Sequence, residues 1–474
     1  MVVSGEEEGH GACRITKLPD CIMESIVSLL PLKDAVNTIL ASPPHWKHLS
    51  HSSILTRRNL EFDYLNVFGS KYQLRYDVDQ DSEFSRRVSK YLQLYQGNKV
   101  DSFKLRCFLN AKSCVSLDDW IRFATTKGVE KLHLGFCLLM SPHQGYVFPR
   151  SLHVGSNLNL KHLSLKECIL RHPTTDCDAF NQLTTLSLKN VHFDQSIMAN
   201  LFTVCALLES LTLYWCRLNG SYYPTRDACP LVAGDRLTHL KVLHCHEEGH
   251  TEISALNLAS LEYHPFCNCR SFHMKAPQLS RIFFANSRVR DTLVPQALTQ
   301  FAMCPGLETL HLQMPAELPR ISSLPTYGNL KQLNLDVELN RLSGQDKDDV
   351  DVNFVLDVVK AAPFLEELVI VVYGEDLSDT NPRETRNNHS IFTNDHLRRV
   401  EMQNFRGNWY ETELAVCIIE ISPKLDKLVI NPLGRCYLGD GKFNELGRSY
   451  SEQQMGVVKE KLKGVKTDAQ IIFL

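Results

Sequence analysis

The chain has 474 residues, 43% of them hydrophobic, and its 51 Lys and Arg residues nearly balance 54 Asp and Glu residues. A chain of this length exceeds one ordinary globular core, so its length predicts several domains or one elongated repeat array. The near-neutral charge, without a clustered basic excess, argues against nucleic acid as a partner. Because no apolar run reaches the roughly 18 residues that span a bilayer, no membrane partner is expected either.

The N-terminus predicts an intracellular protein. It reads MVVSGEEEGHGACR, which is polar and acidic and does not have the pattern of a secretory signal. We expect residues 1–13 to form a disordered tail and the protein to be cytoplasmic and/or nuclear. The 16 cysteines are then expected to be thiols, because intracellular proteins rarely keep disulfides.

Residues 14–55 predict three short helices. Apolar residues recur at helical spacing in the first helix, at Ile22, Ile26, Leu29 and Leu30. A second helix fits residues 33–40, and residues 43–46 open a third. So short a segment cannot bury all its leucines internally, which predicts a partner for the remaining apolar surface. The alternative is a helical cap that closes a repeat array.

The same segment resembles the F-box, especially its plant form. The resemblance is carried by Leu18-Pro19, Ile22, Ile26, Leu29-Leu30-Pro31, Asp34-Ala35-Val36, Thr38 and Trp46. In that family the segment docks onto the Skp adaptor, and through it onto the cullin and RING subunits of a ubiquitin ligase. The resemblance implies an adaptor contact formed by Leu18, Pro19, Ile22, Ile26, Leu29, Leu30, Leu32, Val36 and Trp46.

Residues 56–98 predict a helical linker, with an amphipathic helix at about residues 81–94. Residues 99–435 then predict leucine-rich repeats. The pattern Leu-x-x-Leu-x-Leu begins at Leu160, Leu183 and Leu208, so these copies lie 23 and 25 residues apart. The predicted strand centres are Phe103, Leu132, Leu163, Leu186, Leu211, Leu240, Leu261, Ile282, Leu310, Leu333, Leu368, Val400 and Leu428.

Alternation along each strand predicts one buried row and one row on a concave face. The side chains of the concave row are mixed polar, charged and aromatic groups, which suit recognition of a protein segment. The candidate target-binding residues are His162, Ser164, Lys166, Ser187, Thr212, Tyr214, Lys241, His311, Asn334 and Glu401. Any one of them could equally be a solvated strand residue, so only the surface as a whole is a candidate site.

Four cysteines occupy the Asn/Cys position of the repeat, where a small side chain turns inward as the strand ends. They are Cys137, Cys168, Cys216 and Cys245. Two polar stretches, residues 346–351 and 375–390, are expected to be surface insertions.

Residues 394–430 resemble the FBD region of many plant F-box proteins. The resemblance rests on His396-Leu397 with Val400, on the Phe405-Arg-Gly407 turn and on a helix over residues 411–421. It implies a plant or plant-like source. Residues 436–474 predict a terminal cap, with a helix near residues 451–462 and a short apolar end at residues 471–474.

One motif could carry catalysis. The residues from His246 to His250 fit H-E-x-x-H, the zinc protease signature. They follow a predicted strand rather than lying on a helix, Gly249 weakens any helix there, and no third ligand is placed. A structural zinc site is the milder alternative, from Cys245, His246, His264, Cys267 and Cys269. Because zinc sites usually contain a Cys-x-x-Cys pair and nucleotide-binding loops are absent from the sequence, we expect no metal, no cofactor and no enzymatic activity.

The predicted fold is therefore α/β, with an N-terminal three-helix F-box followed by a right-handed leucine-rich-repeat solenoid that has a parallel concave sheet. The predicted function is that of the substrate-recognition subunit of an SCF-type ubiquitin ligase, which holds an unidentified target protein on its repeats. One alternative is a leucine-rich-repeat scaffold or inhibitor without a ligase role. A zinc hydrolase centred on His246 is the alternative of a different class.

Overall fold

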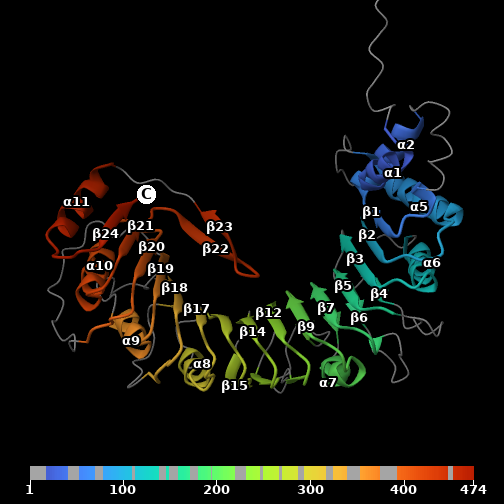
Figure 1. Cartoon of the computed structure of the whole chain (residues 1–474). Coiled ribbons are helices and arrows are strands. Elements are labelled where there is room, and N and C mark those ends of the chain that lie inside the picture. Colours follow the sequence, from blue (N-terminus) through green and yellow to red (C-terminus); the bar gives the residue numbers. More distant parts are fainter. Residues whose placement is uncertain are drawn as a thin grey trace, which may run out of the picture. The chain divides into compact units, whose positions relative to one another are not determined.

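Two compact units make up the chain. Unit 1 comprises residues 1–193 and 204–207, and unit 2 comprises residues 194–203 and 208–474. Both are built from helices and parallel strands (Figure 1). The computed structural model describes residues 18–40, 53–69, 78–108, 113–137, 146–148, 159–170, 180–193, 195–218, 231–245, 249–265, 269–286, 293–315, 324–338, 353–373, 392–446 and 452–474.

Unit 1 begins with the helices of the predicted box and continues into repeat strands. Its helices include α1 (Asp20–Leu29), α2 (Leu32–Leu40), α4 (Tyr64–Phe68), α5 (Val78–Leu94) and α6 (Ser113–Thr126). Its main sheet has the order β1 (Asn59–Phe62), β2 (Ser102–Phe108), β3 (Lys131–Cys137), β5 (His162–Lys166) and β7 (Thr185–Lys189). A second, narrow sheet contains β4 (Val147–Phe148), β6 (Ile169–Leu170) and β8 (His192–Phe193).

Unit 2 repeats the same plan. Its main sheet has the order β9 (Ser210–Tyr214), β12 (His239–Cys245), β14 (Ser260–Pro265), β16 (Arg281–Ala285), β17 (Thr309–Pro315), β18 (Gln332–Glu338), β19 (Glu367–Tyr373), β20 (Arg399–Gln403), β21 (Lys427–Ile430) and β24 (Gln470–Phe473). Its shorter strands are β10 (Arg217–Leu218), β11 (Leu231–Ala233), β13 (Gly249–Ser254) and β15 (Cys269–Lys275). Its helices are α7 (Gln195–Val204), α8 (Leu293–Phe301), α9 (Asn353–Ala361), α10 (Trp409–Ile421) and α11 (Glu452–Lys463). Val204, the last residue of α7, is counted with unit 1.

Leucine alternation creates the core of both units. In unit 1, Leu163 lies beside Leu186 and Leu165 beside Leu188 in a parallel register, and all four side chains are buried. Every predicted strand centre, from Phe103 to Leu428, lies in a strand, so that prediction is confirmed. Leucines repeated at one register therefore stack into a continuous apolar ladder.

The sheets extend further than the predicted repeats. Strand β1 lies within the stretch predicted as a helical linker and pairs with β2 in parallel. At the other end of the chain, β24 pairs with β21. Each of these strands adds hydrogen bonds and apolar cover to a strand that would otherwise form an edge of its sheet.

A left-handed residue at the strand end turns the repeat cysteine inward. Glu167, Trp215 and His244 have φ values of 57°, 53° and 55°, and each directly precedes a buried cysteine. The expectation for Cys137 is wrong, because its side chain is exposed. Strand β3 continues to Cys137 without such a turn, so the buried position falls on Phe136 instead.

The FBD-like region contains the elements expected from its sequence. Strand β20, a turn at Gly407 with φ of 81°, helix α10 and strand β21 follow in that order. The buried Glu411 carboxylate accepts hydrogen bonds from the N–H groups of Arg406, at 2.9 Å, and Asn408, at 2.8 Å. This carboxylate therefore joins the turn to the first turn of α10.

No sequence pattern predicted the hairpin that follows β21. Strands β22 (Gly434–Gly439) and β23 (Lys442–Leu446) form an antiparallel hairpin, called here the inner hairpin. In unit 2 it lies on the opposite side of the main sheet from helices α8, α9 and α10 (Figure 1). It consequently covers the sheet face that carries the non-core side chains of the strands.

We predict that Glu411 makes unit 2 less stable as the pH rises. Burial raises the pKa of this carboxyl from 4.5 to about 7. Because the folded-state pKa lies above the unfolded value, the stability that Glu411 contributes is fully present below pH 4.5 and is lost as the pH rises through about 7. In Glu411→Gln, unfolding free energy measured with urea should fall less between pH 5 and pH 7.5 than in the wild type.

The control for this prediction is Glu420→Gln, an exposed position on the same helix. It should keep the pH dependence of the wild type. Equal slopes of unfolding free energy against pH in Glu411→Gln and the wild type would show that Glu411 does not titrate as described.

Candidate functional site

Helix α1 is apolar on two faces. Met23 and Val27 are buried on one face, one helical turn apart. On another face Ile22, Ile26 and Leu29 are 45%, 38% and 86% exposed, and Val36 of α2 is 38% exposed. These four exposed residues are called here the outer stripe. A helix with one apolar face buried and a second one exposed has the pattern of an interaction surface rather than of a closed cap.

Hydrogen bonds to the C-terminal end of α1 fix the helix that carries most of the outer stripe. The Arg57 guanidinium donates to the carbonyl oxygens of Val27, at 2.5 Å, and Leu30, at 3.0 Å. A positive charge at the C-terminal end of α1 also complements the helix dipole. Burial lowers the pKa of Arg57, and its charge at neutral pH is unaffected because an arginine pKa is so high.

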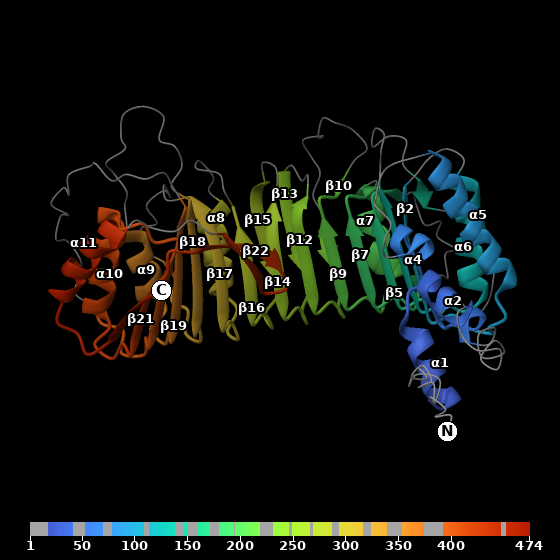
Figure 2. The ribbon, with the colours of Figure 1, turned by 90° about the horizontal axis from the view of Figure 1, so that it is seen from above.

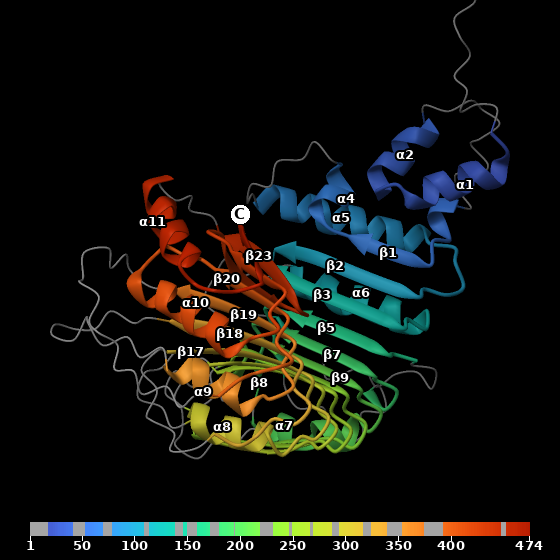
Figure 3. The same cartoon turned by 60° about the vertical axis from the view of Figure 1, so that its left-hand side comes forward.

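Helix α2 is anchored by α4. The Leu32 N–H donates to Asn66 Oδ1 at 2.6 Å, and Lys33 Nζ donates to the Phe68 carbonyl oxygen at 2.6 Å. Asp63 caps α4 by accepting from the Asn66 N–H at 2.7 Å. Figure 3 shows α1, α2 and α4 beside β1 within unit 1. The box helices are thus held by polar contacts near their ends and by the buried Met23 and Val27, which leaves the side chains of the outer stripe exposed.

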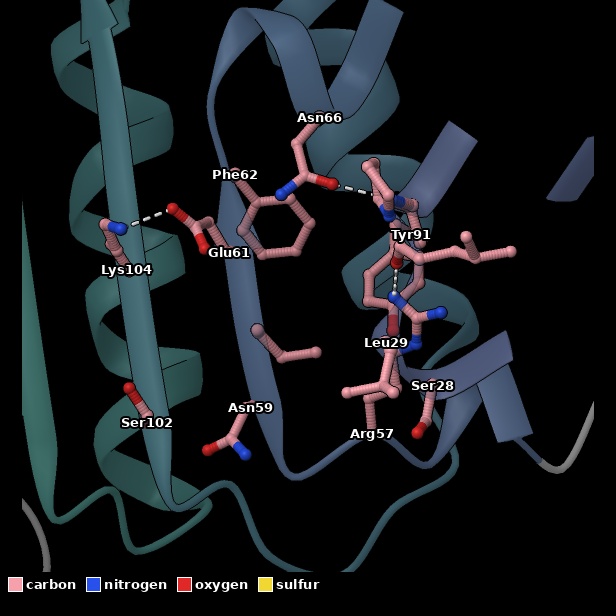
Figure 4. A pocket seen from close by; sticks show the side chains of 14 residues that line it. Ser28, Leu29, Arg57, Asn59, Glu61, Phe62, Asn66, Tyr91, Ser102 and Lys104 are labelled. Atoms are coloured by element: carbon pink, nitrogen blue, oxygen red, sulfur yellow. Dashed lines mark hydrogen bonds and ion pairs between the residues drawn. The ribbon is translucent and has the colours of Figure 1, made fainter. Parts of the chain in front are cut away.

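A cleft separates the turn between α1 and α2 from the first strands (Figure 4). Its volume is about 350 Å³, and its walls include Leu30, Leu32, Phe62 and Tyr91. Lys104 lies on its far side and pairs with Glu61 at 2.5 Å. Among the described residues, the turn is therefore only partly packed against the strands.

The predicted adaptor residues fall into three groups. Pro19 and the outer stripe are exposed, whereas Leu18, Leu30 and Leu32 are half-buried. Trp46 lies outside the described residues. The adaptor contact itself stays a prediction. Sequence reasoning missed Arg57, because a single basic residue after the box gives no periodic signal.

The predicted target-binding residues of unit 1 lie where alternation places them. His162, Ser164 and Ser187 are half-buried between leucines, and Lys166 is exposed at its strand end. Burial, with help from nearby lysines, lowers the pKa of His162. In unit 2, Thr212 is half-buried and Tyr214 is exposed.

The inner hairpin lies over strands of the main sheet of unit 2, as seen from above in Figure 2. Parallel register aligns five side chains of successive strands, called here the inner row. They are Lys241, Glu262, Phe283, His311 and Asn334. Tyr437 stacks on Phe283 with ring centroids 3.9 Å apart, and Phe443 stacks on His311 at 5.6 Å. The expectation of a row open to solvent is therefore wrong for His311, which is 5% exposed.

Three further predicted target-binding residues make polar contacts with other residues of the chain. Lys241 forms an ion pair with Asp440 at the hairpin tip. Arg435 donates to Asn334 Oδ1 at 2.6 Å. Glu401 accepts from Gln403 at 2.7 Å. Whether these residues bind a target stays a prediction, and the inner hairpin was missed because its contacts join distant parts of the sequence.

An aromatic group lies beside the inner row. Trp215 stacks on His244 at 5.1 Å, and His244 lies 4.3 Å from His264. Burial lowers the pKa of His264 to about 4 and also lowers that of His244. The two imidazoles are consequently neutral at physiological pH, so that with the exposed Tyr214 they present an uncharged aromatic surface.

Most of the H-E-x-x-H motif, residues 246–248, lies outside the described residues. In the part of the chain that is described, no group of three or more His, Cys, Asp or Glu side chains could hold a metal ion. Nor does any described helix combine the length and apolar character needed to cross a membrane.

The chain is similar to known leucine-rich-repeat proteins. Residues 91–466 match the family described as At1g61320/AtMIF1, LRR domain. The chain is 25% identical to the F-box/FBD/LRR-repeat protein At4g03220 of Arabidopsis thaliana over 476 residues, which cover 89% of this chain and 90% of that protein. The resemblance to plant F-box proteins with leucine-rich repeats is therefore confirmed.

Two other Arabidopsis thaliana relatives match over a shorter stretch. The F-box protein At1g49610 is 30% identical over 43% of this chain and 44% of its own length. The F-box/LRR-repeat protein At3g03360 is 26% identical over 43% of this chain and 38% of its own length. The chain thus covers less than half the length of these two relatives.

We predict that Arg57→Met loosens α1. The substitution keeps the apolar stem of the side chain but removes two charge-assisted hydrogen bonds, each worth about 1.5–3 kcal/mol. Hydrogen–deuterium exchange of the α1 amides should speed up by at least about tenfold. Arg58→Met is the matched control, because Arg58 is exposed and its guanidinium pairs with Asp101 at 2.8 Å, whereas the guanidinium of Arg57 bonds to α1. Equal exchange of α1 in the two variants would contradict the anchoring role of Arg57.

Proposed function

The chain belongs to the leucine-rich-repeat family described as At1g61320/AtMIF1, LRR domain, and from this premise we propose that it is the substrate-recognition subunit of an SCF-type ubiquitin ligase. In this role the box binds a Skp-type adaptor, and through it the cullin and RING subunits, in the cytoplasm or the nucleus. The repeats bind a target protein. In this role the chain itself catalyses no reaction and needs no cofactor.

The outer stripe is the observation that carries this proposal. Ile22, Ile26 and Leu29 follow one another at helical spacing on a face of α1 that is exposed. Burial of apolar surface stabilises a complex by roughly 25 cal/mol per Å². The stripe therefore suits a hydrophobic helical partner, and the resemblance to F-box proteins supports the adaptor as that partner.

Attachment to a ligase would be enough for catalysis by proximity. A target held on the repeats meets the ubiquitin-conjugating enzyme of the complex at a raised effective concentration. The chain then needs only a durable contact with the adaptor and a selective contact with the target. In unit 1, the polar faces of strands β5 and β7 supply varied side chains for the second contact.

A leucine-rich-repeat scaffold without a ligase link is the alternative. Such a protein would also use the repeats for binding, so target binding does not separate the two functions. Adaptor binding does, because a scaffold has no need of the outer stripe.

We predict that Ile26→Asp with Leu29→Asp abolishes adaptor binding. Two carboxylates in an apolar contact would be buried without partners, which should weaken binding by at least about 100-fold. The measurement is titration of the full chain with a purified plant Skp-type adaptor in surface plasmon resonance. The far-ultraviolet circular dichroism and the unfolding midpoint should stay unchanged, because both residues are exposed.

The matched control places the same two charges on exposed apolar residues of the repeats. Met303 is 78% exposed and Phe364 is 50% exposed, so Met303→Asp with Phe364→Asp should bind the adaptor like the wild type. If the Ile26 and Leu29 variant binds the adaptor as tightly as this control does, the outer stripe is not the adaptor surface. If the wild type itself does not bind, the scaffold function is favoured.

A further inference from the structure

The inner hairpin is shaped to present two aromatic rings on one side. Its turn consists of Gly439, Asp440 and Gly441, which have φ values of 93°, 56° and 70°. Tyr437 and Phe443 are register partners on the two strands, and their ring centroids lie 5.3 Å apart. The turn therefore places an acidic residue between two neighbouring aromatic side chains.

The inner row receives these rings. Phe283 and Ala285 are buried together with Leu243, and Tyr437 packs against this cluster. His311 makes edge contacts with Phe283 at 4.7 Å and with Tyr437 at 5.3 Å. Because Phe283 and Leu243 lie on the face that is solvated in a simple repeat strand, the sheet carries an apolar and aromatic recess that needs an occupant.

Charge complementarity fixes the register of this occupant. Lys241 pairs with Glu262 at 3.2 Å and with Asp440 of the hairpin tip. The Asp440 N–H donates to Glu262 Oε1 at 3.1 Å. The tip is thus recognised through both its side chain and its backbone, as an acidic turn would be in a ligand.

The fit beneath the hairpin is incomplete. Among the described residues, Asp336 Oδ1 and Arg435 Nε are buried without a hydrogen-bond partner. Each such atom destabilises the closed arrangement, because a buried polar atom without a partner has lost its hydrogen bonds to water. A two-stranded hairpin is also marginally stable by itself. These contacts are those of a segment that can leave its site. A permanently packed segment would provide hydrogen-bond partners for its buried polar atoms.

We propose that the inner row is a binding site for a protein turn in which two aromatic side chains flank an acidic residue, and that the inner hairpin is its internal occupant. A target segment of this chemistry displaces the hairpin. This inference rests on the proposed function, because it names the kind of target that the repeats would hold.

Tethering makes the hairpin a strong competitor. A segment joined to its site by a short connection has an effective concentration in the millimolar range. A free segment with the same contacts is therefore excluded at micromolar concentration as long as the hairpin is closed. Weakening the hairpin without altering the inner row should uncover the site.

The test uses the full chain and a synthetic probe. The probe is a fluorescent peptide of residues 433–446, with Ser in place of Cys436 and a disulfide between cysteines added at its ends. The uncovered variant is Tyr437→Ala with Phe443→Ala, and its binding of the probe is measured by fluorescence anisotropy. We expect it to bind the probe at least tenfold more tightly than the wild type does.

The matched control changes the opposite side of the same hairpin. Cys436 and Asn444 are exposed register partners, so Cys436→Ala with Asn444→Ala should bind the probe as weakly as the wild type. Asp440→Lys in the full chain is a second way to loosen the hairpin, and it leaves both aromatic side chains in place. This variant should also gain probe binding.

A charge exchange tests the register. A probe carrying Lys at position 440 should bind the uncovered variant at least tenfold more weakly, and Lys241→Asp in that variant should restore binding. The inference is overturned if the uncovered variants bind the probe no better than the control does, or if the charge exchange restores nothing. No adaptor takes part in this experiment, so its outcome is independent of the adaptor test of the proposed function.

Discussion

A single repeat cannot bury its own leucines, and this constraint determines most of the architecture. Leu163 and Leu165 are covered because Leu186 and Leu188 occupy the same register on the next strand, as Leu132 and Leu134 do on the preceding one. Every repeat strand therefore needs a neighbouring strand that covers its leucines. The outermost repeat strands need another element that does the same. In unit 1, β1 pairs with β2 and covers it, and in unit 2, β24 pairs with β21 and covers it. The elements outside the predicted repeats thus complete the apolar ladder of each unit.

Two apolar surfaces lie outside the ladder, and only one of them is covered by the chain. Phe283 belongs to the non-core face of β16, yet it is buried because the chain brings Tyr437 onto it. Ile22 and Leu29 belong to a helix that is already anchored through Met23 and Val27, and they are exposed. The chain covers the first surface with its own hairpin and leaves the second accessible. An accessible apolar surface suits a partner that is always needed, and a covered one suits a partner that must compete.

Local patterns predicted the parts of the fold that depend on local physics. The strand centres follow from period-two alternation, and α5 follows from its amphipathic spacing, because both patterns lie within a few residues. The Cys137 side chain was predicted wrongly, since burial at this repeat position depends on a left-handed residue, which Cys168 has before it in Glu167 and Cys137 lacks. The inner hairpin depends on contacts at much greater distance, such as the 199 residues between Lys241 and Asp440. No periodicity in the sequence encodes such a pair.

The candidate sites, like the fold, could be predicted from the sequence only in part. Helical spacing and the family resemblance located the outer stripe, but not the half-burial of Leu30, which depends on the cleft beside Phe62. Alternation located Lys241, His311 and Asn334 of the inner row, but it did not single out Glu262 and Phe283. Nor could it show that His311 is buried under aromatic rings. A polar row on a repeat surface therefore has two possible occupants, a foreign protein or a segment of the same chain. For residues such as Lys241 and His311 the second occupant is present, so selectivity for a target would depend on the difference between its contacts and those of the hairpin.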